Sequence, residues 1–227
     1  MNNFLEIKNL SKVYNDKGEQ ITIFENTNFK LESNQLVTLT GPSGSGKSTL
    51  IHILCLLDSP NNGSFFLKQS EDLFKKNENE KSTFRKNNIS IVFQSFNLIS
   101  DLTAIENVML PSLYSDKDNN ETETDALRLL RKMNLENRIN HLPKELSGGE
   151  QQRVAIARSM INNPELILAD EPTGNLDSEN SQKVFDLLQE LAERDNLGVL
   201  IVTHNTDLAL KTDNLIRMQD GLIVKDS

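Results

Sequence analysis

The sequence has 227 residues, a formal net charge of −9, 37% hydrophobic residues and one cysteine. The acidic balance argues against a general nucleic-acid binder, because neutralising phosphates requires clustered Lys and Arg side chains. No apolar run approaches the roughly 18 residues that span a bilayer, and Met1–Glu6 lacks the basic and apolar regions of a signal peptide. The single cysteine excludes an internal disulfide and suits a reducing compartment. We therefore expect one domain with an inserted subdomain.

The N-terminal residues 4–32 alternate apolar and polar side chains, which is typical of half-buried β-strands. A turn at Asn15–Gly18 divides this segment, so it predicts a pair of antiparallel strands. A second turn, at Asn61–Gly63, precedes Ser64–Leu67.

A phosphate-binding loop follows a β-rich run at Leu36–Thr40 and precedes a helix-like run at Leu50–Leu57. The loop matches G-x-x-x-x-G-K-[ST], and strand, loop and helix are the context that this motif requires. Its glycines let backbone N–H groups wrap a phosphate, its lysine reaches the β and γ oxygens, and Ser48 is a Mg²⁺ ligand. A glycine-rich turn with a chance lysine is the simpler interpretation, which the context disfavours. The predicted nucleotide-binding residues of the loop are Gly41, Ser43, Gly44, Ser45, Gly46, Lys47, Ser48 and Thr49.

The middle of the chain has mainly a helical pattern. Residues 71–88 are polar and charged, which predicts a solvated loop or an exposed helix, and residues 96–160 are mostly helical. The acidic, Asn-rich tract Ser115–Thr124 is interpreted as a loop that leads into a helix at Asp125–Met133.

A second phosphate contact is predicted at Leu146–Glu150. Ser147 fits a helix N-cap, and Glu150 completes a capping box three residues later. Gly148 and Gly149 leave backbone N–H groups accessible at the positive end of the helix dipole, which makes an anion site. Alone, this pattern indicates an ordinary capped helix; the other motifs favour the functional interpretation.

Two carboxylates follow a buried strand at Leu166–Ala169. We expect Asp170 to hold Mg²⁺ and Glu171 to take a proton from the attacking water. Without a phosphate loop in the same chain, two solvated acids at a strand end would be the better interpretation.

The last buried strand, Gly198–Thr203, ends at His204. This histidine can reach γ-phosphate oxygens or the attacking water, although a terminal histidine is more often structural or solvated. Beyond it, Asp220-Gly221 between two apolar runs predicts a closing hairpin.

These motifs together resemble the ATP-binding subunit of ABC transporters along nearly the whole chain. The resemblance adds three residues: Gln94 as a ligand of Mg²⁺ or water, Asp177 at the nucleotide site, and Tyr14 as the aromatic residue that stacks on adenine. In family order, the matching elements are Tyr14 (A-loop), Gly41–Thr49 (Walker A), Gln94 (glutamine loop), Leu146–Glu150 (signature), Leu166–Asp170 (Walker B) with Glu171 (catalytic glutamate), Gly174–Asp177 (D-loop) and His204 (switch histidine).

Several longer runs resemble the macrolide-exporter and lipoprotein-release branch of that family. They include Leu56–Asp58, Phe93–Leu98, Leu102–Val108 and Ala169–Asp177. Thr203-His204-Asn205 is similar to the lipoprotein-release type, in which asparagine follows the histidine.

The resemblance implies an α/β fold with a P-loop NTPase (RecA-like) core, an N-terminal antiparallel β-subdomain and an inserted α-helical signature subdomain. It divides a single ABC ATPase domain, residues 1–227, into a core with the β-subdomain (1–94 and 161–227) and a helical subdomain (95–160). It also implies a head-to-tail homodimer bridged by ATP with Mg²⁺, bound to integral membrane permease subunits at the cytoplasmic face of the inner membrane. Part of Ser95–Pro111, which carries the apolar residues Phe96, Leu98, Ile99, Leu102 and Val108, is expected to dock the membrane subunit.

Two other classes of function remain open in the sequence. A non-transport ABC ATPase that pairs with a membrane protein, such as the cell-division type, shares every motif described above. A nucleotide-gated binding module that does not hydrolyse ATP is disfavoured by Glu171 and His204. The transported substrate is not encoded in this chain, because in the family the membrane subunits choose it.

Overall fold

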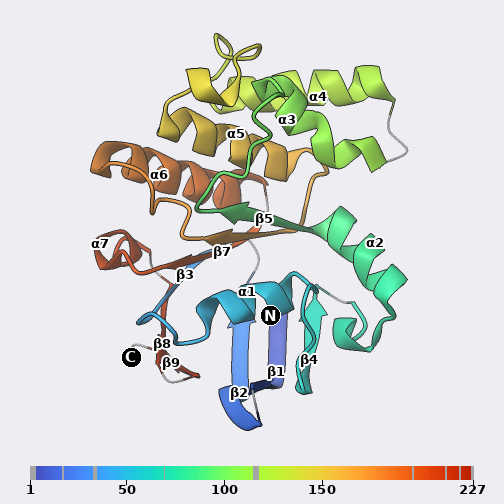
Figure 1. Cartoon of the computed structure of the whole chain (residues 1–227), viewed down its shortest axis with the longest axis vertical. Coiled ribbons are helices and arrows are strands. Elements are labelled where there is room, and N and C mark those ends of the chain that lie inside the picture. The colour runs from blue at the N-terminus through green and yellow to red at the C-terminus, as the bar shows by residue number, and fades with distance from the viewer. Residues whose placement is uncertain are drawn as a thin grey trace.

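Two β-sheets with a helix between them organise the chain (Figure 1). A computed structural model describes residues 4–16, 18–32, 35–68, 70–114, 118–195, 197–212, 214–219 and 221–225. Its α/β architecture is the predicted P-loop NTPase fold, with antiparallel strands at the N-terminus and helices inserted between two core strands.

The smaller sheet is antiparallel and has the order β2-β1-β4. Its strands are β1 (Leu5–Asp16), β2 (Glu19–Leu31) and β4 (Asn62–Leu67). The pairing of β1 with β2 confirms the antiparallel strands predicted from residues 4–32. A register shift leaves Ile23 of β2 without a partner, because Lys12 pairs with Phe24 and Val13 with Thr22. Such a bulge redirects a side chain, and Ile23 lines the cavity described below.

The larger sheet has the order β5-β6-β7-β3-β8-β9, and only its edge strand β9 is antiparallel to its neighbour. Parallel pairing aligns the carboxyl ends: Thr40 lies opposite Thr203, and Asp170 opposite Val202. The segments that follow these strands therefore meet at one edge of the sheet, where ligands bind in open α/β folds. The strands are β3 (Leu36–Thr40), β5 (Ile89–Phe93), β6 (Leu166–Asp170), β7 (Gly198–Thr203), β8 (Leu215–Gln219) and β9 (Leu222–Lys225).

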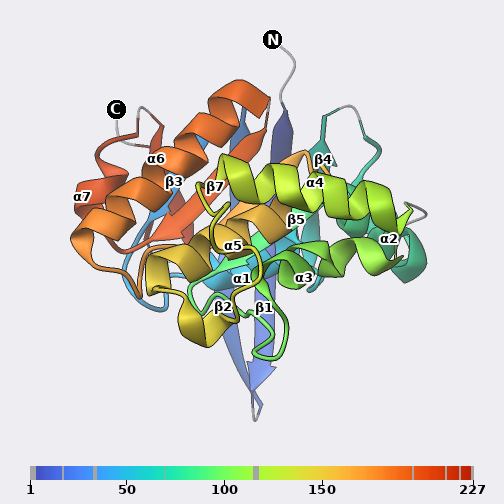
Figure 2. The ribbon, with the colours of Figure 1, turned by 90° about the horizontal axis from the view of Figure 1, so that it is seen from above.

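Helices cover both faces of the larger sheet. Helix α1 (Lys47–Leu54) lies between the two sheets, whereas α5 (Gly148–Met160) and α6 (Ser178–Asp195) cover the opposite face (Figure 1). Figure 2 shows α3 and α4 lying over α5. The remaining helices are α2 (Glu78–Asn88), α3 (Ala104–Met109), α4 (Asn119–Lys132) and α7 (Thr206–Ala209), with 3₁₀ turns η1 (Leu73–Lys75), η2 (Leu110–Tyr114) and η3 (Pro143–Glu145).

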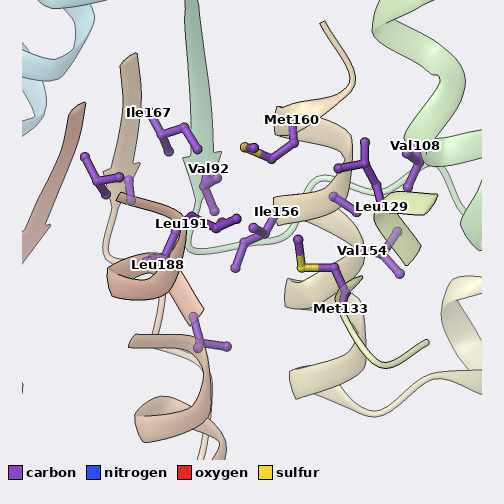
Figure 3. Packing of buried hydrophobic residues seen from close by; sticks show 14 of the residues in the cluster. Val92, Val108, Leu129, Met133, Val154, Ile156, Met160, Ile167, Leu188 and Leu191 are labelled. Atoms are coloured by element: carbon purple, nitrogen blue, oxygen red, sulfur yellow. The ribbon is translucent and has the colours of Figure 1, made fainter. Parts of the chain in front are cut away.

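Alternate residues of the central strands pack into two separate hydrophobic cores. Ile167 and Ala169 of β6 face the core beneath α5 and α6, whereas Leu166 and Leu168 face the core around α1. A strand buried on both faces needs an uninterrupted apolar run, which explains why these segments show no polar alternation. Figure 3 shows the first core, where Ile156 of α5 lies between helices and sheet.

Two predicted helix boundaries are wrong. The helix expected at Asp125–Met133 begins at Asn119 instead, so most of the predicted loop is its first turn and a half. Thr122 and Ala126 are buried one and two turns from that start, and their contacts with the core outweigh the poor helix propensity of the Asn residues. The helix expected at Leu50–Leu57 ends at Leu54, because Leu56 has a φ of 56° that no helix residue adopts.

Packing in the first core leads to a prediction for stability. Ile156→Ala removes a fully buried side chain and should lower the free energy of unfolding by about 2–5 kcal/mol. Chemical denaturation monitored by circular dichroism measures this change. Ile99→Ala is the matched control, because 48% of the Ile99 side chain is exposed and its loss should cost less than about 0.5 kcal/mol. Equal losses in the two variants would contradict this description of the core.

Candidate functional site

A cavity of about 410 Å³ lies at the carboxyl edge of the larger sheet. The loop between β3 and α1 forms one wall, with Ser43, Gly44, Gly46, Lys47, Ser48 and Thr49. Asp170 at the end of β6, Glu171 directly after it and His204 after β7 form the opposite wall. The predicted phosphate loop, acidic pair and histidine, far apart in the sequence, thus line one cavity.

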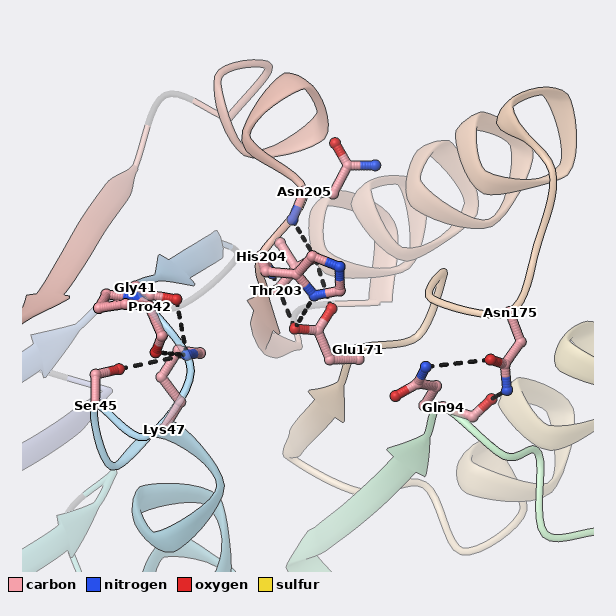
Figure 4. Close-up of polar contacts among 10 residues, drawn as sticks. All are labelled: Gly41, Pro42, Ser45, Lys47, Gln94, Glu171, Asn175, Thr203, His204 and Asn205. Atoms are coloured by element: carbon pink, nitrogen blue, oxygen red, sulfur yellow. Dashed lines mark hydrogen bonds and ion pairs between the residues drawn. The ribbon is translucent and has the colours of Figure 1, made fainter.

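The conformation of the loop turns its lysine back onto its own backbone (Figure 4). Lys47 Nζ donates hydrogen bonds to the carbonyl oxygens of Gly41 and Pro42 at 2.8 and 2.7 Å, and to Ser45 Oγ at 3.3 Å. Gly46 has a φ of 100°, and a Cβ there would lie 2.8 Å from the Ile23 side chain. Burial lowers the pKa of Lys47, while the charges of Glu171 and Asp170 oppose that shift. The loop thus holds a cation among neutral acceptors, which a phosphate can replace.

The pKa of Asp170 is raised above its ordinary value, because the nearby positive charges do not fully stabilise its carboxylate. Burial is the main cause that raises its pKa, and the neighbouring Glu171 carboxylate raises it further. The charge of His52, the Ser48 hydroxyl and the charge of Lys47 lower it and only partly offset these effects. A hydroxyl and a carboxylate are oxygen donors of the kind Mg²⁺ prefers, and the cation would supply the missing charge. Two protein oxygen donors leave positions that phosphate oxygens and waters can fill, which is how Mg²⁺ is usually held in nucleotide sites.

The Glu171 carboxylate is held by three donors. Thr203 Oγ1 donates to Oε2 at 2.9 Å, and the backbone N–H of His204 donates to Oε1 at 2.9 Å. The same Oε1 lies 2.7 Å from Nδ1 of His204 (Figure 4). The carboxylate is thus fixed at the cavity wall and paired with a histidine whose side chain is 72% exposed. A carboxylate beside an imidazole is a suitable arrangement for accepting and passing on a proton.

The backbone at Glu171 is in the left-handed region. Its φ is 48°, which costs a non-glycine residue free energy, and its N–H is bonded to the carbonyl of Val202 at 2.8 Å. That bond extends the pairing of β6 and β7 by one residue and holds the unfavourable conformation. Strained residues concentrate at functional sites, and here the strain turns the carboxylate toward β7.

Gln94 lies apart from the cavity wall. Its side chain donates from Nε2 to Oδ1 of Asn175 at 3.1 Å, and Asn175 returns a bond from Nδ2 to the Gln94 carbonyl at 3.1 Å (Figure 4). Gln94 and the D-loop are therefore joined directly. Gln94 does not line the cavity that Ser48 and Asp170 line.

The N-terminus of α5 has the predicted capping box. Ser147 Oγ accepts from the Glu150 N–H at 3.3 Å, and the Glu150 carboxylate accepts from the Ser147 N–H at 2.8 Å. Glu150 also pairs with Arg138 at 2.9 Å. Ser147 is exposed and does not line the cavity, so the N-terminus of α5 takes no part in the phosphate cavity of its own chain.

Gly149 is required by packing against α6. A Cβ at this position would lie 2.5 Å from Oδ1 of Asn180. The same Asn180 binds Asp177 through its backbone N–H at 2.8 Å and its amide at 2.7 Å. Asp177, expected at the nucleotide site, is thus the acceptor at the start of α6 and lies near the signature segment, not in the cavity.

Tyr14 lies on β1 beside the start of α1. Its hydroxyl donates to Oδ2 of Asp58 at 2.6 Å and interacts with the Thr49 hydroxyl. It does not line the cavity itself, although Thr49 does.

Sequence reasoning missed several residues that hold the site together. Thr203, which fixes Glu171, could have been suspected from its place beside His204 at the end of a strand. Asn180 carries no motif signal, and Asp58 belongs to a run that resembles the macrolide-exporter and lipoprotein-release branch but has no predicted role at the site. Only the packing of distant segments brings them to Gly149 and Tyr14.

Comparisons with known proteins agree with this geometry. The ABC transporter family profile matches residues 24–174. An uncharacterized ABC transporter ATP-binding protein of Methanocaldococcus jannaschii is 44% identical over 97% of this chain and 98% of its own. The lipoprotein-releasing system ATP-binding protein LolD of Rickettsia felis is 42% identical over 98% of both chains. Among solved structures, the ABC transporter cassette MJ0796 bound to ADP and Pi superposes with a TM-score of 0.87 at 39% identity, over 98% of this chain and 97% of that one.

The contacts of Lys47 lead to a binding prediction. Lys47→Ala removes the only cation that the cavity wall offers among the described residues, so affinity for ATP should fall by about 10- to 100-fold or more. Isothermal titration calorimetry measures the affinity, and the rise in melting temperature on adding ATP should shrink accordingly. Lys75→Ala, at a side chain that is 82% exposed on η1, is the control and should bind ATP normally. Unchanged binding by Lys47→Ala would place the nucleotide elsewhere.

Proposed function

The chain belongs to the ABC transporter family, and we propose that it couples ATP hydrolysis to lipoprotein release or export through a membrane protein complex. The observation that carries this proposal is the Glu171 carboxylate, held by Thr203 and His204 across one cavity from Lys47. A base that faces a phosphate-binding loop is required to hydrolyse ATP, and a module that only binds nucleotide does not need it.

The ATPase reaction follows from the positions of these side chains. Lys47 supplies positive charge to the β- and γ-phosphates, and backbone N–H groups of Gly44 and Gly46 surround them. Glu171 accepts a proton from the attacking water, while His204 pairs with the same carboxylate and orients it. Catalysis of phosphoryl transfer rests mainly on such positioning and electrostatics.

Ser48 and Asp170 are the residues that would hold Mg²⁺. Held by these two residues, Mg²⁺ would supply positive charge that stabilises the reacting phosphates. Its charge would also compensate the buried Asp170 carboxylate, whose pKa burial raises. Gln94 would join these ligands through its side-chain oxygen, an atom that neither of its two bonds with Asn175 uses.

A head-to-tail dimer explains why α5 presents its N-terminus away from the cavity. Each chain has one phosphate loop, and the capped N-terminus of α5 does not line the cavity that this loop forms. Two chains placed head to tail would let Ser147, Gly148 and Gly149 of each complete the γ-phosphate site of the other. The MJ0796 cassette has been solved as a dimer, at 40% identity and a TM-score of 0.86 over 97% of both chains. ATP would then hold the dimer closed, and hydrolysis would open it.

A second cavity, of about 470 Å³, offers a surface for the membrane subunit. Its lining includes Pro111 at the end of the expected docking segment, together with Arg158 and Ile161. Arg158 donates to the carbonyl oxygens of Phe96 and Asn97 at 2.8 and 2.6 Å. The guanidinium therefore connects this cavity to the segment that follows Gln94, and a movement at one end would be passed to the other.

The expected docking segment is less exposed than its sequence indicates. Val108 is fully buried, because it faces α4 and α5 on the apolar side of α3, and Leu98 packs against the same core. Ile99 stays 48% exposed and is the best remaining apolar contact in the segment. Relative movement of the proposed helical subdomain, residues 95–160, would carry this contact with it.

No helix among the described residues is long and apolar enough to cross a membrane. We therefore propose that an integral membrane permease contributes the transport path and chooses the substrate, with this chain bound at the cytoplasmic face. The relatives named LolD favour lipoprotein release. A cell-division type of ABC ATPase, which signals through its membrane partner without transport, would use the same nucleotide site.

The general base leads to a prediction for turnover. Glu171→Gln keeps the shape of the side chain but removes the proton acceptor, so ATP hydrolysis should fall by about 10²–10⁴-fold while ATP still binds. Steady-state phosphate release measures hydrolysis, and light scattering should detect an ATP-dependent dimer that accumulates. Turnover near the parent rate would remove Glu171 from this role.

The matched control for the dimer is the double variant Glu171→Gln/Ser147→Arg. The arginine at the N-terminus of α5 would block the place where the partner's phosphate docks, yet it is far from the chain's own cavity. The double variant should bind ATP as a monomer. A dimer of normal stability would show that the subunits do not meet through α5.

The proposed docking surface leads to a prediction for binding and stimulation by the membrane subunit. Ile99→Asp should leave ATP binding by the isolated subunit intact, because the side chain is exposed and lies outside the nucleotide cavity. It should weaken co-purification with the membrane subunit and reduce the hydrolysis that this subunit stimulates. Leu222→Asp, at an equally exposed leucine of β9, is the control. Normal co-purification and coupling by Ile99→Asp would place the docking surface elsewhere.

Reconstitution with the co-purified membrane protein separates transport from signalling. Lipoprotein release from proteoliposomes that depends on ATP and on Glu171 would support the proposal. A complex that hydrolyses ATP without releasing lipoprotein or exporting a solute would favour the cell-division type.

A further inference from the structure

We propose that Asp58 and Lys12 are positioning residues that hold the Tyr14 ring in place for the adenine base. This inference rests on the proposed binding of ATP with its base on Tyr14. Three side chains from β1 and from the segment after α1 form the brace, which no motif of the sequence identified.

The position of Tyr14 makes it a platform beyond the phosphate cavity. It lies directly opposite Ile21 across the β1–β2 pair, and both side chains are exposed, at 39% and 47%. Ile23, the bulged residue two positions further along β2, lines the phosphate cavity. Thr49, which also lines that cavity, interacts with the Tyr14 hydroxyl. Ile23, Ile21 and Tyr14 therefore form an apolar strip from the phosphate cavity to an exposed aromatic ring. A flat base attached to the triphosphate could lie along this strip and stack on the ring.

The Tyr14 hydroxyl is fixed by a carboxylate that is itself fixed. Asp58 Oδ2 accepts from this hydroxyl at 2.6 Å, a short hydrogen bond to an ionised group. Asp58 Oδ1 accepts from Lys12 Nζ and from the Ser59 N–H, both at 2.7 Å. Burial alone would raise the pKa of Asp58, but the hydrogen bonds from Lys12, Tyr14 and Ser59 bring it below its ordinary value. The acceptor is thus ionised at neutral pH and held by partners other than Tyr14.

Lys12 occupies one face of the ring. Its Nζ lies 4.5 Å from the ring centroid, within the range of a cation–π contact. Only 7% of the surface of Lys12 is exposed. Lys12 Nζ also donates to the Ser59 carbonyl at 2.7 Å, so the cation cannot move away freely. A ring that is covered on one face and anchored at its hydroxyl leaves one face for a base.

Holding the Tyr14 ring in place lowers the entropy that is lost when a base stacks on it. An unanchored tyrosine at the end of a hairpin would lose side-chain freedom when a base stacks on it, and ordering such a side chain weakens binding by about 2- to 10-fold. The brace orders the ring beforehand. It should therefore affect only ligands that carry a base, whereas Lys47 should affect every triphosphate.

Tyr14→Phe tests the brace without removing the ring. In the Glu171→Gln background, which prevents turnover, we expect this variant to bind ATP about 2- to 10-fold more weakly and to bind inorganic tripolyphosphate as the parent does. Asp58→Asn should show the same selective loss. Competition titrations against a fluorescent nucleotide measure both ligands, and melting curves without ligand verify that each variant is folded.

Tyr14→Ala separates the brace from the base contact on which it rests. If Tyr14→Ala weakens ATP relative to tripolyphosphate while Tyr14→Phe and Asp58→Asn match the parent, the ring binds the base but the brace is refuted. If Tyr14→Ala leaves the ratio unchanged, the base lies elsewhere and both ideas fail, while hydrolysis by Glu171 stands. Equal losses for ATP and tripolyphosphate in Tyr14→Phe would show a general structural effect and would also overturn the proposal.

Discussion

The parallel pairing of β3, β7 and β6 is the constraint on which the site depends. It aligns Thr40 with Thr203 and Asp170 with Val202, so the phosphate loop, the acidic pair and His204 follow from one edge of the sheet. The bond from the Glu171 N–H to the Val202 carbonyl extends this pairing beyond the strands. The sheet thus stabilises a left-handed residue and directs its carboxylate toward the cavity.

Two segments that follow this edge, at Gln94 and Asn175, are connected to each other by side chains, and α5 is connected to the first of them. Gln94 exchanges two bonds with Asn175, and Arg158 of α5 binds the carbonyls of Phe96 and Asn97. Phe96 and Asn97 both have left-handed φ values, 55° and 49°, so two polar bonds stabilise a tight bend. Arg158 is partly buried, and this burial lowers its pKa, so breaking these bonds would leave a partly desolvated charge without these partners. The Gln94 segment and α5 therefore move together more easily than apart.

The two ends of a bound nucleotide would meet different physical environments. At the phosphate end, Lys47 and backbone N–H groups provide charge, and Asp170 and Ser48 provide oxygen donors for a cation. At the proposed base end, Tyr14 and Ile21 provide exposed apolar surface, and the charged pair beneath the ring serves only to fix it. A polar contact between the hydroxyls of Tyr14 and Thr49 thus connects the smaller sheet to α1, in addition to apolar packing.

The fold class and the residues around the phosphate cavity could be predicted from the sequence, because buried apolar runs and a glycine-rich motif are local patterns. The buried runs before Gly41, Glu171 and His204 can only be strands, and the glycine loop requires the conformation that it adopts. Only the tertiary structure decided the start of α4 and the burial of Val108, because contacts with α5 outweigh weak local preferences. It also decided the partners of Tyr14, Gln94 and Gly149. Each of these contacts joins segments that are distant in sequence, so no local pattern of residues could reveal it.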